Sequence, residues 1–312
     1  MTDDHLHLGA GPEFDSIRSL LSRWGQTARG IGDDAATIDL PRGERLVVSV
    51  DSFVQGEHFE SEWISAREIG FRATTAALSD LAAMAASPIG VLFAVNVPDG
   101  WRDKLTEIGD GVAEAARTAG ARIVGGNIAG GTELSITTTV LGSAFAPLTR
   151  GGAGVGDRLY VTGTLGGPGA AVAAWQAGRV PDAAWRERFA RPAARIYEAR
   201  WLADRGVTSC IDISDGIVAD ASHLAAASHC GLEIHIDQLP VIDGVNPADA
   251  SRSGEEYELL VSAPSLDVAA FATAFGLRLT EIGRVVPGAP DVITLERGAR
   301  VAAVGGHDHF SS

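Results

Sequence analysis

The chain has 312 residues, with 25 lysine and arginine residues against 40 aspartate and glutamate residues, and a formal net charge of −15 at pH 7. Hydrophobic residues make up 46% of it, which supports substantial cores in one large or two ordinary domains. The acidic balance argues against a nucleic acid or an anionic membrane surface as partner.

Segments of the first half alternate between strand-like and helix-like periods. The expected strands are 46–50, which ends at Asp51, 90–97, 122–124 and 134–141, and the expected helices are 65–86 and 101–119. Ser65 is the expected N-cap of the first helix, and Pro88 stands just beyond its end. Gly125 and Gly126 indicate either a tight turn or a backbone that approaches a ligand closely.

A glycine-rich stretch, 150–157, cannot continue either period and is the best domain boundary. We therefore predict an N-terminal domain over 1–149 and a C-terminal domain over 150–312. The second half contains further strands and helices: strands at 158–161, 231–236 and 257–261, helices at 169–176 and 192–203, and a strand-to-helix turn at 213–216 with a helix up to Ser228. The pattern predicts an α+β protein made of two α/β domains with mixed sheets.

Lysine and cysteine usage narrows the chemistry. Lys104 is the single lysine, which excludes a Walker-type phosphate loop and argues against the paired lysine of protein kinases. Two cysteines, Cys210 and Cys230, are too few for a disulfide framework.

The acidic start does not resemble a signal peptide, and no apolar stretch reaches the ~20 residues of a membrane span. We expect a soluble, cytoplasmic protein.

Acidic residues stand at turn-like positions beside glycine in several separated segments. Alone, Asp33 and Asp34 fit an ordinary turn, and Asp51 fits the end of a strand. Together, scattered carboxylates favour Mg²⁺ and phosphate, because Mg²⁺ takes oxygen ligands and bridges to substrate phosphates.

Asp80 is the most informative of these acidic residues. On the predicted helix it shares a core-facing stripe with Ile69, Ala73, Ala76 and Met84. A buried carboxylate needs a partner. That partner is either an arginine, Arg67 or Arg72, or a metal ion, and we favour the metal.

Three polar residues, Asp212, Ser214 and Asp215, cluster at the strand-to-helix turn. Capping of the helix by Ser214 or Asp215 explains one of them. The free N–H groups of a helix start also attract phosphate, so Ser214 is a candidate nucleotide contact. His58 is a lone histidine of the kind that is more often structural. His307 and His309 bracket Asp308, but we assign no zinc to them.

These residues resemble the thiamine-monophosphate kinase family, within the superfamily that includes aminoimidazole ribonucleotide synthetase, selenophosphate synthetase and a hydrogenase-maturation protein. The resemblance covers nearly the whole chain. The stretches that carry it are Gly30–Ala36, Val50–Phe59, Leu78–Met84, Ile211–Gly216, Ser253–Leu259 and Asp308–Phe310.

The resemblance implies transfer of the ATP γ-phosphoryl group to thiamine monophosphate, in a homodimer whose N-terminal sheets pair. It implies Mg²⁺ ligands at Asp34, Ser49, Asp51, Asp80, Asn127, Asp212 and Asp215, of which Asp34, Asp80, Asp212 and Asp215 are expected to be catalytic. The residues implied for ATP are Gly126, Asn127, Arg150 and Ser214. Those implied for the substrate are His58, Glu255 and His307.

Four positions depart from the family pattern. Asn127 replaces an aspartate and Val50 a threonine, both in the same implied metal site, so Mg²⁺ should bind there more weakly. Glu256 replaces an aspartate and His307 an aromatic residue, which alters the expected substrate pocket. Two alternatives therefore stay open: a paralogous ATP-dependent enzyme with another acceptor, and a nucleotide-binding protein that has lost turnover.

Overall fold

The computed structural model describes residues 12–28, 31 and 35–302, and Asp33, Asp34 and His307 therefore lie outside the described residues. The chain divides into two compact units, residues 1–81 with 86–147, and residues 82–85 with 148–312. We describe each unit by itself. No helix in the described part of the chain is long and apolar enough to cross a membrane.

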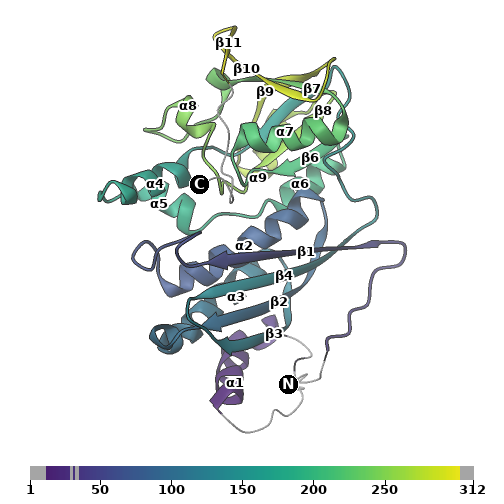
Figure 1. The fold of residues 1–312 in the computed structure, drawn as a ribbon. Coiled ribbons are helices and arrows are strands. Elements are labelled where there is room, and N and C mark those ends of the chain that lie inside the picture. The colour runs from purple at the N-terminus through teal and green to yellow at the C-terminus, as the bar shows by residue number, and fades with distance from the viewer. Residues whose placement is uncertain (1–11, 29–30, 32–34, 303–312) are drawn as a thin grey trace. The chain divides into compact units, whose positions relative to one another are not determined.

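Unit 1 contains a four-stranded mixed sheet in the order β1-β4-β2-β3, in which β2 and β3 are parallel and the other pairs antiparallel. Its strands are β1 (Arg45–Val54), β2 (Ser87–Val97), β3 (Arg122–Gly130) and β4 (Ser135–Ala144). Its helices are α1 (Pro12–Trp24), α2 (Ala66–Ala83) and α3 (Leu105–Thr118), with the short 3₁₀ helices η1 (Gly25–Thr27) and η2 (Asp99–Lys104). Helices α2 and α3 lie over one face of the sheet (Figure 1).

Local sequence explains where α2 begins and how closely it packs. The Ser65 hydroxyl accepts the N–H of Glu68 at 3.3 Å, and the Glu68 carboxylate accepts the N–H of Ser65 at 2.8 Å. This capping box confirms Ser65 as the start of the helix. A Cβ atom on Gly70 would lie 2.0 Å from the carbonyl oxygen of Ile108. Glycine at this position therefore permits the close contact between α2 and α3.

Unit 2 contains a seven-stranded sheet in the order β11-β10-β7-β9-β5-β8-β6. Its strands are β5 (Arg158–Thr162), β6 (Ser209–Asp212), β7 (Gly231–His235), β8 (Leu259–Ala263), β9 (Leu279–Val286), β10 (Asp291–Glu296) and β11 (Ala299–Val301). Its helices are α4 (Gly167–Gln176), α5 (Ala183–Ala190), α6 (Ile196–Ala203), α7 (Ile217–Ser228), α8 (Pro247–Ala250) and α9 (Val268–Phe275), with the 3₁₀ helix η3 (Ile236–Gln238). Side chains of the strands and of α7 form its core, including Leu159, Ile211, Leu224 and Leu232.

The structure corrects the expected end of one strand and excludes one of the two interpretations of Gly125 and Gly126. Strand β1 continues to Val54, so Asp51 lies inside the strand and not at its end. Gly125 and Gly126 belong to β3 and do not form a tight turn. A Cβ atom on Gly126 would lie 2.1 Å from the carbonyl oxygen of Phe93, so only glycine fits at this position beside strand β2.

Cys210 and Cys230 are free and buried.

Candidate functional site

The first group of site residues lies between β1 and α2. Alternation along β1 buries Val47 and Phe53 and turns Ser49 and Asp51 to the same face. On that face the Ser49 hydroxyl donates a hydrogen bond of 2.5 Å to Asp80 on α2. The structure thus brings two of the predicted metal ligands into contact and places Asp51 on their side of the sheet.

Asp80 is half-buried, although its helical neighbours Ser79 and Leu81 are fully buried. Arg67, one of the two arginines considered as its partner, donates instead to Glu114 at 2.9 Å. The other, Arg72, is fully buried, with its guanidinium carbon 5.7 Å from the centre of the Phe53 ring. Because Asp80 is itself only half-buried, a ligand can approach it.

Thr138 joins this group without having been expected there. It pairs directly with Asp51 in the β1–β4 register, so the two side chains share the face that looks toward α2. Thr138 is fully buried, and its hydroxyl has no hydrogen-bond partner among the described residues. The sequence feature that could have indicated Thr138 is the run of three threonines at 137–139, because alternation along a strand turns the middle threonine toward the core.

Val50 and Asn127 lie on the opposite face of the same sheet. Val50 alternates with Asp51, and Asn127 pairs with Ala94 of β2, which pairs with Thr137 of β4. Strand β3 lies three strand spacings from β1, so the distance between the two strands is about 14 Å. A Mg²⁺ ion sits only about 2.1 Å from each ligand atom, so within one chain no single ion contacts both positions. The two substitutions therefore alter separate places on one face.

His58 lies in the loop that follows β1. The N–H of Val54 donates to its Nδ1 at 3.2 Å, and its ring centre lies 5.2 Å from that of Phe53. Because Nδ1 is an acceptor here, the proton of the neutral ring is on Nε2. The loop thus fixes the orientation of the ring and leaves Nε2 as its donor nitrogen.

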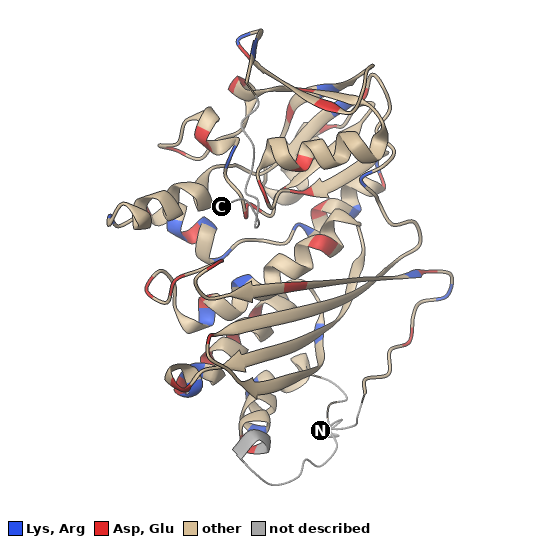
Figure 2. Cartoon of the chain, viewed as in Figure 1, with Lys and Arg blue, Asp and Glu red and all other residues tan. Residues whose placement is uncertain are grey.

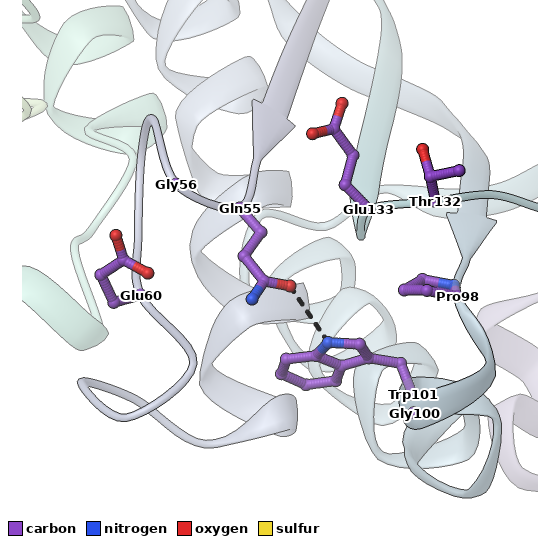
Figure 3. A pocket seen from close by; sticks show the side chains of 8 residues that line it. All are labelled: Gln55, Gly56, Glu60, Pro98, Gly100, Trp101, Thr132 and Glu133. Carbon is purple, nitrogen blue, oxygen red and sulfur yellow. Dashed lines mark hydrogen bonds between the residues drawn. The ribbon is translucent and has the colours of Figure 1, made fainter.

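A hollow of about 410 Å³ opens beside this loop, at the edge of the sheet where β1, β2 and β3 end (Figure 3). The indole N–H of Trp101 donates to the side-chain oxygen of Gln55 at 3.1 Å. This bond ties the segment after β2 to the segment that carries His58. The carboxylates of Glu60 and Glu133 lie on two sides of the hollow (Figure 3). Among the described residues, none of the site residues predicted from the sequence lines this hollow.

In unit 2, Asp212 is the last residue of β6, and Ser214 and Asp215 occupy the turn between β6 and α7. Helix α7 begins after Gly216, whose φ is 113°, and no side chain caps it. The expectation that Ser214 or Asp215 caps the helix was therefore wrong. Within the described residues, the hydroxyl of Ser214 and the carboxylate of Asp215 form no hydrogen bonds, so both remain available to a ligand.

Asp220, which sequence reasoning missed, holds this turn from the first part of α7. Its carboxylate accepts the N–H groups of Ser214, Asp215 and Gly216 at 3.0, 3.1 and 3.2 Å. These N–H groups are thus engaged, so Ser214 and Asp215 can contact a ligand through their side chains but not through their N–H groups. Burial, and then the charges of Asp212 and Asp215, raise the pKa of Asp220 to about 7, against the effect of the N–H donors. In the sequence, the role of Asp220 was indicated only by its position shortly after the turn.

Glu255 lies in the segment that leads into β8, and its N–H donates to the carbonyl of Ser214 at 2.6 Å. Glu256 does not line an open pocket, as its substitution had suggested. It is buried, and its carboxylate accepts the N–H of Gly166 and the Ser253 hydroxyl, each at 2.5 Å. Burial raises the pKa of Glu256 to about 7, although Arg188 and these two donors act to lower it.

Arg150 is exposed at the start of unit 2, and its side chain forms no ion pair with the described residues. Within the described part of the chain, no three histidine, cysteine or acidic side chains already converge at one point. The predicted residues thus form two sets, Ser49, Asp51 and Asp80 in unit 1, and Asp212, Ser214, Asp215 and Glu255 in unit 2.

The chain resembles known proteins over nearly its full length. Residues 32–144 match the AIR synthase related protein N-terminal domain, and residues 154–296 match the corresponding C-terminal domain. Thiamine-monophosphate kinase of Escherichia coli K12 is 34% identical over 96% of both chains. The crystal structure of thiamine-monophosphate kinase from Stenotrophomonas maltophilia K279a superposes with a TM-score of 0.81 at 30% identity, over 91% of this chain and 97% of that one.

A further solved structure, described as AaThiL complexed with AMPPCP and TMP, superposes with a TM-score of 0.76 at 29% identity, over 95% of this chain and 96% of the other. These similarities span both units. The α+β fold with two mixed sheets that the sequence predicted is thereby confirmed. The chain belongs to the thiamine-monophosphate kinase family of AIR synthase related proteins.

Proposed function

We propose that the protein transfers the γ-phosphoryl group of ATP to the phosphate of thiamine monophosphate, giving thiamine diphosphate and ADP. The observation that carries this proposal is the 34% identity to a thiamine-monophosphate kinase over 96% of both chains. The similar structure that is described as complexed with AMPPCP and TMP supports the same pair of substrates. The division into domains 1–149 and 150–312 and a cytoplasmic location are kept as parts of the proposal.

Oxygen atoms dominate both sets of site residues, and this chemistry fits Mg²⁺. The unpartnered, buried hydroxyl of Thr138 beside Asp51 supports a ligand on that side of the sheet. We assign Ser49, Asp51 and Asp80 in unit 1, and Asp212 and Asp215 in unit 2, as Mg²⁺ ligands. Bound Mg²⁺ would neutralise charge on the phosphate groups. Asp34 and Asn127 stay predicted ligands from the family resemblance.

The protein's own side chains contribute positioning. The Ser214 hydroxyl and the exposed Arg150 guanidinium are suited to phosphate oxygens of ATP, and an arginine contact can be bidentate. His58 would donate from Nε2, and Glu255 would offer a carboxylate to the cationic thiazolium of the substrate. Gly126 and His307 stay predicted contacts.

A homodimer is the second part of the proposal. Leu46, Val48 and Val50 on β1 are 49%, 53% and 62% exposed, and they lie on the sheet face opposite to the one that α2 and α3 cover. Strands β2 and β4 contain no charged residue, and the sheet is mostly uncharged (Figure 2). An uncovered apolar sheet face is typical of an interface. A second copy of the chain is the partner that the family resemblance implies.

The proposed reaction is tested by incubating the protein with ATP, Mg²⁺ and thiamine monophosphate and separating the products. Thiamine diphosphate and ADP in equal amounts are expected. ADP formation only with another acceptor would instead indicate the paralogous enzyme. ATP binding in calorimetry, without ADP formation for any acceptor tried, would indicate a nucleotide-binding protein that has lost turnover.

A further inference from the structure

The segment that carries Glu255 has a strained backbone. Glu255 and Tyr257 have φ values of 55° and 54°, in the left-handed region that residues with a side chain rarely adopt. Two such residues flank Glu256, and neither is a glycine or an asparagine. A strained conformation of this kind persists only where the surrounding structure fixes it.

On one side, backbone hydrogen bonds join the segment to the turn after β6. The N–H of Tyr257 donates to the carbonyl of Ile213 at 2.9 Å, and the N–H of Ile213 donates to the carbonyl of Glu258 at 2.8 Å. With the bond from Glu255 to Ser214, three backbone bonds connect the two segments. The positions of Glu255 and of the turn are thus linked.

On the other side, the segment is held by buried charges. The carboxylate of Glu258 accepts the hydroxyl of Thr162 at 2.6 Å and Nε of Arg195 at 2.8 Å. Arg188, on α5, joins this carboxylate to that of Glu256, because its Nη2 lies 3.0 Å from Glu258 Oε1 and 3.4 Å from Glu256 Oε2. The same Nη2 also donates to the backbone carbonyl of Glu256 at 3.2 Å.

The hydrogen bonding of Arg188 is incomplete, so stability alone does not explain this side chain. Its Nε is buried without a hydrogen-bond partner, and an unsatisfied buried donor destabilises a fold. Glu258 already has a bidentate partner in Arg195. What Arg188 adds is a connection between the strained segment and its surroundings, because its Nη2 contacts the carboxylate and carbonyl of Glu256 and also the carboxylate of Glu258 and the carbonyl of Thr164.

We propose that Arg188 is a positioning residue for the reaction, which fixes the strained segment 255–257 so that Glu255 presents its carboxylate to the substrate. Arg188 acts through Glu256 and Glu258 and does not itself touch the substrate. The inference rests on the proposed function of Glu255 as a substrate contact. Ser214 depends on Arg188 much less, because Asp220 holds its turn with three backbone bonds.

This asymmetry predicts a split between the two substrates. In Arg188→Gln, the KM for thiamine monophosphate should rise about tenfold or more, whereas the KM for ATP should stay within about twofold. Arg188→Lys should be intermediate, because an ammonium group keeps the charge but lacks the fork of a guanidinium. The side chain of Arg188 lines a hollow of about 500 Å³ and is 19% exposed, so water can replace part of it and the variants should fold.

A matched control is Arg158→Gln, which removes an arginine of the same unit that pairs with exposed Glu281 at 2.9 Å. Its two KM values should not change. Urea denaturation of all variants separates lost stability from lost positioning. A lower stability of Arg188→Gln with an unchanged KM for thiamine monophosphate would overturn the proposal, because Arg188 would then be only structural.

Hydrogen exchange followed by mass spectrometry tests the positioning independently of activity. Arg188→Gln should increase exchange at the amides of Glu255 and Tyr257 and leave those of Ser214 and Asp215 protected. If the wild-type protein forms no thiamine diphosphate, the proposed function fails, but this exchange pattern still shows whether Arg188 fixes the segment. Unchanged exchange at Glu255 and Tyr257 would contradict the positioning role.

Discussion

The hydroxyl of Ser49 donates a hydrogen bond to the carboxylate of Asp80, which joins strand β1 to the last turns of helix α2. The two residues are 31 positions apart. The bond orients one carboxylate oxygen of Asp80, on a side chain that remains partly open. This geometry suggests that Asp80 can be changed without loss of the fold.

Asp80→Asn should therefore lower kcat about 100-fold or more, because it removes a charge that would balance the phosphates. The amide oxygen can still accept the bond from Ser49, so the melting temperature should stay close to that of the wild type. Steady-state kinetics and thermal unfolding measure the two effects. Asp103→Asn, at an exposed aspartate of the same unit, is the control and should have wild-type kcat. Wild-type kcat in Asp80→Asn would exclude Asp80 from the site.

Thr138→Val replaces a buried hydroxyl that has no partner among the described residues with a methyl group of similar size. Without ligand, the variant should be as stable as the wild type or more stable by about 1 kcal/mol, because an unsatisfied polar group is removed. The stabilisation by Mg²⁺ and ATP should become smaller, since the ligand loses an oxygen partner beside Asp51. Urea denaturation with and without ligands measures both effects. Thr139→Val, one position along and facing the other way, serves as the control. Equal ligand stabilisation in Thr138→Val and the wild type would argue against a ligand at this hydroxyl.

Val50→Thr restores a side-chain oxygen of the family pattern, and Asn127→Asp restores the negative charge of a carboxylate. Each should raise the Mg²⁺ affinity measured by calorimetry in the presence of ATP, by about tenfold for the added carboxylate. Because the two positions are three strands apart in one chain, their effects should be additive within about 0.5 kcal/mol. A clear departure from additivity would mean that a second copy brings the two positions to one ion. Unchanged affinity in both variants would remove these positions from the metal site.

Glu256→Gln isolates the titration of a buried carboxyl group. Because the pKa of Glu256 is raised to about 7 in the folded protein from an ordinary value of 4.5, the folded state holds this proton more tightly than the unfolded state. The stabilising contribution is complete below about pH 4.5 and is lost as the pH rises toward 7. The free energy of unfolding of the wild type relative to Glu256→Gln should therefore fall across this interval, by at most about 1.4 kcal/mol per pH unit. Urea denaturation over the interval measures this difference, and a difference that does not vary with pH would contradict the raised pKa.

Val48→Lys tests the proposed dimer, because it places a charge in the middle of the exposed apolar face of β1. The variant should sediment as a monomer at concentrations where the wild type is a dimer, since burying an unpaired charge at an interface is unfavourable. Val180→Lys, at a position in unit 2 that is 94% exposed, should leave the association unchanged. If both variants sediment like the wild type, this face is not the interface.

Sequence patterns predicted much of the fold because local rules govern helix starts and strand periods. The capping box at Ser65 and Glu68 fixed the beginning of α2, and hydrophobic periodicity located most strands of unit 1. The pattern failed for α5, whose residues carry no clear apolar period. It also placed the end of β1 too early, because Asp51 resembles a strand end when only its own neighbours are considered.

By itself, the sequence determined the family, since its motifs match that family over nearly the whole chain, and it predicted the oxygen-bearing residues of the site. Only the tertiary structure decided which of these residues share a face. Strand register turns Asp51 toward Asp80 and turns Val50 away, and it separates Val50 from Asn127. The supporting residues Asp220 and Arg188 were likewise found only in three dimensions. The physical reason is that their partners are fixed by backbone pairing and buried ion pairs between distant segments, which no local pattern encodes.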